Sequence, residues 1–218
     1  MTQRQAAARR GLFLDLDGTL ADTLPALRKA YHAFLARFGA AGSAREFESL
    51  NGPPIPEIVG RLVAAHRIAG DRDALVALYR GLLEAEHGAA APIEGARDLL
   101  AAAAARGWIV AVVTSNPRAA TLAWLARAGL AGRVAAVVGG DEGTRAKPDP
   151  APYRLALART GCDAAASRAI EDGVQGALAA LGAGLATWRL GGTSAPELAA
   201  HPLFRGVLPD LRAALSLL

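Results

Sequence analysis

The hydrophobic pattern of this chain changes character along its length. A short apolar run, Gly11–Leu14, predicts a buried strand, and the stretch that follows carries only helical periodicity. The helices predicted in that stretch are Asp22–Phe38, Arg45–Leu50, Pro56–Ile68 and Asp71–His87. Because no strand pattern appears between Asp22 and Ala90, we expect these helices to form a separate small bundle.

Helices and strands alternate from Pro92 onward. The predicted order is a helix at 95–106, a strand at 108–113, a helix at 118–128, a strand at 134–138, a polar loop at 139–150, a helix to 160, a strand at 168–170, a helix to 183, a strand at 185–188 and two short terminal helices. Such alternation is typical of a parallel sheet covered by helices. We therefore predict an α/β protein in which a helical insert follows the first strand.

Composition and charge narrow the class of protein further. Of the 218 residues, 52% are apolar and 20% are charged, as in a globular protein. Cys162 is the single cysteine, so we expect no disulfide framework and a cytoplasmic location. No segment approaches the ~20 consecutive apolar residues of a membrane span, so no membrane attachment is expected.

The net charge of +4 does not by itself indicate a nucleic-acid partner. Basic and acidic residues alternate along the predicted helices, and no run of like charge forms a basic patch. We expect a mildly basic surface that attracts a small anionic substrate, with no nucleic acid and no obligate protein partner.

Two carboxylates follow the first predicted strand. Asp15 and Asp17 stand two positions apart, and side chains at that spacing share a face of an extended chain. Open α/β sheets bind ligands at the carboxyl ends of their strands, where such a pair favours a bound cation or a shared proton. An ordinary turn would explain Gly18 and Thr19, but it does not explain why Asp15 interrupts the apolar run.

More polar side chains follow the later strands. They are Thr114, Ser115 and Asn116 after the second strand, Lys147 in the loop after the third, and Glu171 and Asp172 after the fourth. Strand ends of a parallel sheet share one edge, so we expect these groups to converge into a site that suits Mg²⁺ and a phosphoryl group. Each also has a plainer explanation: residues 114–117 could cap the next helix, 171–173 could form a turn, and Lys147 could lie in a surface loop.

Lysine is rare in this chain. Of the 24 Lys and Arg residues, only residues 29 and 147 are lysines. A lysine in a loop rich in Gly and Pro therefore suggests a requirement for a compact ammonium group, although Lys29 shows that lysine also occurs on an ordinary helix.

Taken together, these motifs resemble the haloacid dehalogenase-like hydrolase superfamily, and within it the phosphoglycolate-phosphatase-like branch. The resemblance covers nearly the whole chain and rests on Asp15–Leu20, Thr114, Lys147–Pro150, and Glu171-Asp172 leading into Gly176 and Ala177. It implies a Rossmann-like parallel sheet core, residues 1–20 and 91–218, flanked by helices. Residues 21–90 would then form a small α-helical cap inserted after the first strand.

The resemblance also implies catalytic roles. Asp15 would be the nucleophile that forms an aspartyl-phosphate, and Asp17 would protonate the leaving oxygen and then deprotonate a water molecule. Mg²⁺ would be held by Asp15, by the backbone carbonyl of Asp17 and by Asp172. Glu171 would be either a further ligand or a partner of the ligands.

Phosphate and substrate binding would fall to a second set of residues. The phosphate-binding groups implied are Thr114, Lys147, Asn116 and the backbone N–H groups near Leu16, Asp17 and Ser115. In the family the cap closes over the substrate, and Asn51 and Gly52 are our candidates for the loop that reaches it. A plain connection between two helices explains these two residues equally well.

Two positions distinguish among the activities of the superfamily. Its dehalogenases and phosphonatases differ at the place of Asp17, so Asp17 favours cleavage of a phosphate ester or anhydride. The sugar phosphomutases that resemble this chain carry a cap His where Leu27 stands, which favours hydrolysis over mutase chemistry.

We therefore predict a Mg²⁺-dependent phosphatase that acts on a small phosphorylated metabolite such as 2-phosphoglycolate. Hydrolysis of a sugar phosphate, a nucleotide or pyrophosphate is the alternative within the same class. A non-catalytic module that binds a phosphorylated metabolite is the alternative from another class, and the intact set of Asp15, Asp17, Lys147 and Asp172 argues against it.

Overall fold

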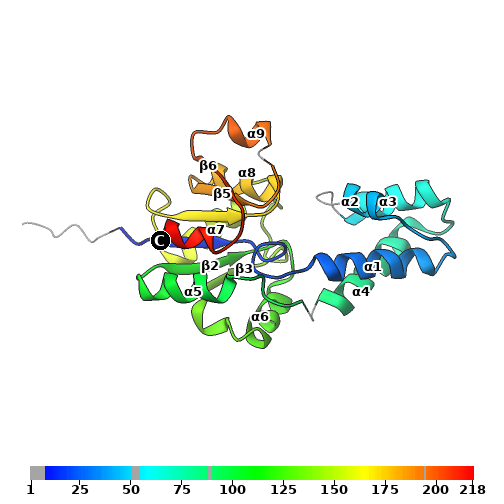
Figure 1. Cartoon of the computed structure of the whole chain (residues 1–218), viewed down its shortest axis with the longest axis horizontal. Helices are drawn as coiled ribbons and strands as arrows, with labels where there is room; N and C mark the ends of the chain where they lie inside the picture. Colours follow the sequence, from blue (N-terminus) through cyan, green and yellow to red (C-terminus); the bar gives the residue numbers. More distant parts are fainter. Residues whose placement is uncertain (1–7, 51–54, 88–89, 194) are drawn as a thin grey trace, which may run out of the picture. The chain divides into compact units, whose positions relative to one another are not determined.

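The chain divides into two units in the computed structural model, which describes residues 8–50, 55–87, 90–193 and 195–218 (Figure 1). The sheet unit combines the chain up to Ala21 with Pro92–Leu218, and the helical unit is Asp22–Ala91. Each division lies one residue beyond the boundary expected from the sequence.

A six-stranded parallel sheet forms the centre of the sheet unit. Its strands are β1 (Gly11–Leu14), β2 (Ile109–Val113), β3 (Ala136–Val138), β4 (Arg168–Glu171), β5 (Ala186–Leu190) and β6 (Phe204–Leu208), in the spatial order β3-β2-β1-β4-β5-β6. Every neighbouring pair is parallel, so the carboxyl ends of all the strands lie along one edge. The predicted α/β fold with a parallel sheet is confirmed.

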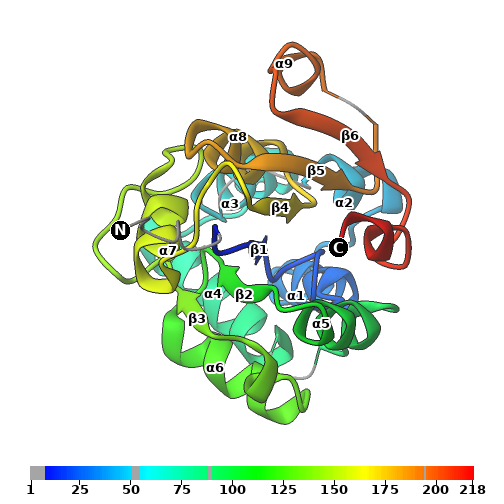
Figure 2. The ribbon, with the colours of Figure 1, turned by 90° about the vertical axis from the view of Figure 1, so that its left-hand side faces the viewer.

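Helices cover both faces of this sheet (Figure 2). They are α5 (Ala96–Ala105), α6 (Arg118–Arg127), α7 (Ala151–Thr160), α8 (Val174–Gly182), α9 (Pro196–Ala199) and the short 3-10 helices η1 (Ala131–Arg133) and η2 (Ala213–Leu217). Helices α7 and α8 pack over one face, where Phe13, Val113, Tyr153 and Leu185 are buried together. Strand β1 is buried along its whole length, as expected for a strand covered on both sides. No helix within the described ranges is long and apolar enough to cross a bilayer.

The sequence pattern missed one strand. Two short helices were expected after residue 188, and the structure has α9 and η2 there with β6 between them. Strand β6 pairs only with β5, at the edge of the sheet, so it is not buried on both faces and shows no apolar run. Arg205 and Gly206 stand in its middle, and Gly206 has a φ of 114°, which further obscures the strand pattern.

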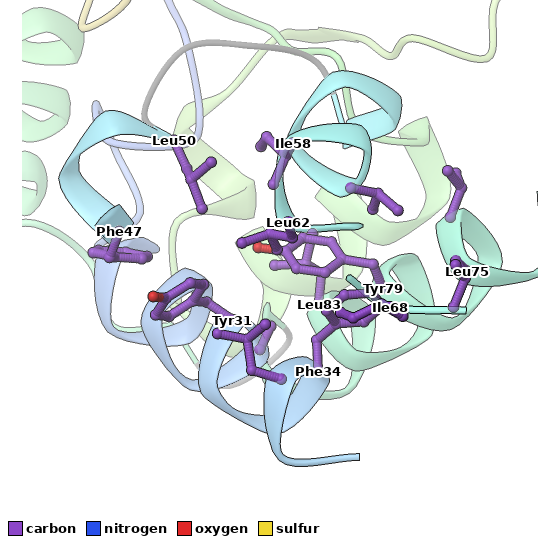
Figure 3. Close-up of a cluster of buried hydrophobic side chains, with 14 residues drawn as sticks. Tyr31, Phe34, Phe47, Leu50, Ile58, Leu62, Ile68, Leu75, Tyr79 and Leu83 are labelled. Carbon is purple, nitrogen blue, oxygen red and sulfur yellow. The ribbon is translucent and has the colours of Figure 1, made fainter. Parts of the chain in front are cut away.

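The helical unit has a hydrophobic core of its own (Figure 3). Its helices are α1 (Leu24–Ala36), α2 (Ala44–Ser49), α3 (Ile55–His66) and α4 (Arg72–His87). Phe34 and Leu62 are fully buried in this core, and each such side chain contributes about 1.5–3 kcal/mol relative to an exposed position. Its helices therefore have an apolar interior that does not depend on the sheet.

The two segments that join the units lie side by side. Ala21 and Pro92 form an antiparallel bridge, the amide of Asp22 donates to the carbonyl of Ala91 at 2.8 Å, and the amide of Ile93 donates to that of Leu20 at 2.9 Å. The helical unit thus leaves the sheet unit and returns to it through one hydrogen-bonded pair of segments.

Candidate active site

The first strand delivers Asp15 to the carboxyl edge of the sheet. The amide of Asp15 donates to the carbonyl of Ile170 at 3.1 Å, which extends the pairing of β1 with β4. After Asp17 the chain turns sharply at Gly18, whose φ is 73°, and a Cβ at Gly18 would stand 2.2 Å from Oδ2 of Asp172. The left-handed conformation and this close approach both require glycine, because a side chain would displace the Asp172 carboxylate.

Lys147 lies at the centre of the site. Its Nζ donates to Oδ1 of Asp15 at 2.6 Å, to Oε1 of Glu171 at 2.6 Å and to the carbonyl oxygen of Val113 at 2.9 Å. These three acceptors use all three protons of the ammonium group. The side chain of Lys147 is only 9% exposed, so the explanation of Lys147 as a surface loop residue does not hold.

Glu171, the last residue of β4, is held from two sides. Its Oε1 accepts from Lys147 and also from the hydroxyl of the buried Tyr153 on α7. On the other side, a Cβ at Gly176 would stand 2.0 Å from Oε2 of Glu171. The absence of a side chain at position 176 is therefore what leaves room for this carboxylate.

The segment after β2 connects to Asp17. Nδ2 of Asn116 donates to Oδ2 of Asp17 at 2.6 Å, and the hydroxyl of the buried Thr114 accepts from the amide of Asn116 at 3.1 Å. Helix α6 begins after this segment, and the amide of Arg118 in its first turn donates to Oδ1 of Asp141 at 2.8 Å. No side chain of the segment 114–117 caps α6, so the helix-cap explanation of these polar residues does not hold.

Three carboxylates meet at this edge of the sheet. One oxygen each from Asp15, Glu171 and Asp172 lies within 4.8 Å of the others. Burial, followed by the negative charge of Asp15, raises the pKa of Glu171 to about 8 and that of Asp172 to about 7. Burial also raises the pKa of Asp15, although the ammonium of Lys147 opposes this.

This cluster fits a hard divalent cation. Burial and the charge of Asp15 raise these pKa values because the ionised carboxylates need more positive charge than Lys147 supplies. A cation with oxygen preference such as Mg²⁺ would supply it. Since Oε1 of Glu171 already accepts from Lys147 and Tyr153, Asp15 and Asp172 are better placed as direct ligands. The carboxylate of Asp17 is not part of the cluster, and the metal-binding role expected for its backbone stays a prediction.

The structure brings together most of the residues singled out in the sequence. Asp15, Lys147, Glu171 and Asp172 converge at one edge, as do Asp17, Thr114 and Asn116. Ser115 is exposed beside them, and Leu16 is buried. Their phosphate-binding roles stay predictions, and Asn51 and Gly52 lie outside the described residues.

Sequence reasoning missed Tyr153. Its hydroxyl contacts Glu171, and Nζ of Lys147 lies 5.6 Å from the centre of its ring. A Tyr on the buried face of a short helix is a usable signal, because its hydroxyl requires a partner there.

Comparisons with known proteins agree with this geometry. A family model described as haloacid dehalogenase-like hydrolase matches residues 12–189. A phosphoglycolate phosphatase from Cereibacter sphaeroides is 34% identical over 157 residues, which cover 68% of this chain and 70% of that protein. A plasmid-encoded phosphoglycolate phosphatase from Cupriavidus necator is 31% identical over 180 residues, or 80% of this chain and 77% of that one.

A solved structure of similar fold carries a phosphate. It is CbbY from Rhodobacter sphaeroides, 25% identical, with a TM-score of 0.71 and coverage of 94% of this chain and 95% of that one. A mutant of the same protein, with a TM-score of 0.70, was solved in complex with xylulose-(1,5)bisphosphate.

Proposed function

The chain belongs to the haloacid dehalogenase-like hydrolase family, and on that basis we propose that it is a Mg²⁺-dependent phosphatase that cleaves a small phosphate monoester through an aspartyl-phosphate on Asp15. The observation that carries the proposal is the buried ammonium of Lys147, which contacts Asp15 and Glu171 at 2.6 Å each. A positive charge at this place reduces the repulsion between the Asp15 carboxylate and a dianionic substrate.

Asp15 and Asp17 divide the chemistry between them. In the first step an Asp15 oxygen bonds to phosphorus, the bond from phosphorus to the leaving oxygen breaks, and Asp17 gives its proton to that oxygen. In the second step water attacks phosphorus, Asp17 takes the proton of the water, and the bond from Asp15 to phosphorus breaks to release phosphate. Asn116 holds Asp17 at 2.6 Å and so orients the group that transfers the proton.

Mg²⁺, when bound by Asp15 and Asp172 with Glu171 beside them, supplies positive charge to the phosphoryl oxygens. Nζ of Lys147 donates a hydrogen bond to Oδ1 of Asp15, one of these two ligands. Thr114 and Asn116, which follow β2, are the side chains we assign to the phosphoryl group.

The relatives favour 2-phosphoglycolate as the substrate. Two of them, 34% and 31% identical, are named phosphoglycolate phosphatases. A sugar phosphate is the second candidate, because the similar CbbY mutant binds xylulose-(1,5)bisphosphate. Both compounds are small phosphate monoesters, so the mechanism above applies to either.

The test is release of inorganic phosphate from 2-phosphoglycolate, xylulose 1,5-bisphosphate, AMP and pyrophosphate, with Mg²⁺ titrated. We expect turnover of at least one monoester, a loss on the order of 10³-fold or more in Asp15→Asn, and a higher Mg²⁺ requirement in Asp172→Ala. Activity that survives Asp15→Asn would refute the nucleophile assignment. A wild-type protein that binds these compounds but hydrolyses none would be a binding module.

A further inference from the structure

A pocket lies at the edge of the sheet where the strands begin, opposite the candidate active site at the strand ends. Its volume is about 380 Å³. Trp108 stands just before β2, Arg168 is the first residue of β4, and Ala186 is the first residue of β5, so the strand beginnings form its floor. Asp15, Glu171 and Asp172 lie at the other ends of β1 and β4, and the two sites are therefore separate.

Three arginines line this pocket, at positions 10, 168 and 205. The guanidinium carbons of Arg10 and Arg168 each lie 4.9 Å from the centre of the Trp108 ring, and that of Arg168 lies 5.9 Å from Trp188. Two of the three guanidinium groups thus lie against indole rings. Such contacts position a guanidinium without neutralising its charge.

Two polar groups in the pocket wall lack compensation. Burial and the neighbouring charge of Arg10 lower the pKa of Arg168, because both disfavour its charged form. The indole N–H of Trp108 is buried and has no acceptor among the described residues, while the residue is only 6% exposed. A buried donor without an acceptor is costly. An anion beside the arginines would offset the repulsion between Arg10 and Arg168.

We propose that this pocket binds a small organic phosphate, with the phosphoryl group held by Arg168 and Arg205. Planar guanidinium groups present paired N–H donors that match phosphate oxygens, and more than one of them is available here. The volume lies in the range of small-molecule sites and exceeds what a single phosphate fills. The rest of the lining includes Trp188 and three alanines, whose apolar side chains suit the organic part of the ligand.

Tryptophan signals can test this directly, because two of the three tryptophans line the pocket. Phenyl phosphate and inorganic phosphate are titrated separately into ¹⁵N-labelled protein in the presence of a chelator, which prevents turnover. We expect saturable shifts of the Trp108 and Trp188 indole N–H signals, with that of Trp124 on α6 unmoved. We also expect phenyl phosphate to bind at least about tenfold more tightly than inorganic phosphate. Equal affinities would overturn the role given to the apolar wall.

Variants that each remove one positive charge test whether phenyl phosphate binds in this pocket. Arg168→Gln and Arg205→Gln should each weaken phenyl phosphate binding about tenfold, and Arg80→Gln, on an exposed position of α4, should leave it unchanged. Arg205 is itself exposed, so its variant keeps the test valid even if Arg168→Gln does not fold. Unchanged affinity in Arg205→Gln and in a folded Arg168→Gln would overturn the proposal, as would the absence of any saturable shift in the wild type.

Discussion

Lys147 shows how much one side chain determines at the residue scale. It is one of only two lysines in the chain, and its ammonium contacts two carboxylates and a backbone carbonyl in a space that is almost closed to solvent. A guanidinium is larger, planar and directional, so it cannot replace three contacts that converge on a single nitrogen.

Lys147→Arg should therefore impair catalysis while the positive charge is retained. We expect kcat to fall about 10²-fold, because the charge beside Asp15 is displaced from its optimal place. Steady-state kinetics with 2-phosphoglycolate or p-nitrophenyl phosphate would measure this. Full activity in the variant would show that charge alone, without the compact geometry, is sufficient.

Gly176 offers a second residue-scale test, with a matched control nearby. In Gly176→Ala the new Cβ would collide with Glu171, since the space there is 2.0 Å, whereas a Cβ at Gly173 would meet nothing within 4 Å. We expect Gly176→Ala to raise the Mg²⁺ concentration needed for half-maximal activity several-fold, and Gly173→Ala to leave it near the wild-type value. Equal effects of the two substitutions would contradict the role given to Gly176.

At the scale of elements, the loop between β3 and α7 is tied down by Glu142. This carboxylate accepts from the amide of Gly139 at 2.8 Å and from Nη1 of Arg159, on α7, at 2.9 Å. The hydrogen bond from Arg159 is the main reason why the pKa of Glu142 lies below its usual value. The contact ties the C-terminal end of α7 to the loop that carries Lys147.

The stabilisation by Glu142 should depend on pH. A carboxyl group whose pKa is lowered by folding stabilises the native state above its unfolded-state pKa, and the contribution disappears as the pH falls through the native-state pKa. Glu142→Gln should cost about 1 kcal/mol of unfolding free energy near pH 7 and almost nothing near pH 3. Denaturant unfolding at the two pH values would measure it.

Glu94→Gln is the control for this experiment. Glu94 also pairs with an arginine, Arg212 at 2.6 Å, but its side chain is 79% exposed. Exposed pairs contribute little, so we expect only a small change at either pH. A cost for Glu94→Gln as large as that for Glu142→Gln would show that the loop contact has no special weight.

Elements also show what the sequence could and could not predict. Polar groups at the carboxyl ends of strands were predictable, because a parallel sheet places those ends on one edge whatever the details of packing. The contact from Tyr153 to Glu171 was not, since it depends on how α7 lies over the sheet. Strand β6 was not predictable either, because it lies at the sheet edge and its pattern is neither alternating nor continuously apolar.

At the scale of the whole molecule, the two units have separate hydrophobic interiors. The core of the helical unit contains residues of α1 to α4, whereas the cluster under α7 and α8 consists of residues of the sheet unit. A substitution in the core of one unit is therefore expected to destabilise that unit more than the other.

Leu62→Ala tests this separation. Removing a fully buried leucine should lower the free energy of unfolding by about 2–5 kcal/mol. Relative to the wild type, amide hydrogen exchange should accelerate more in α1, α3 and α4 than in β1, β2 and β4. Leu122→Ala, at a position on α6 that is 38% exposed, is the control and should cost about 0.5 kcal/mol or less. Equal acceleration across both units in Leu62→Ala would show that they unfold as one.

The paired segments at Ala21 and Pro92 make the architecture modular. Because the insert begins and ends at hydrogen-bonded neighbours, a change in its length need not move the segments that join it to the sheet unit. If the helical unit contacts the substrate, as the sequence predicts, its contacts could change without altering the residues of the sheet unit. One part of the gene can be exchanged while Asp15, Lys147 and Asp172 stay where the sheet holds them.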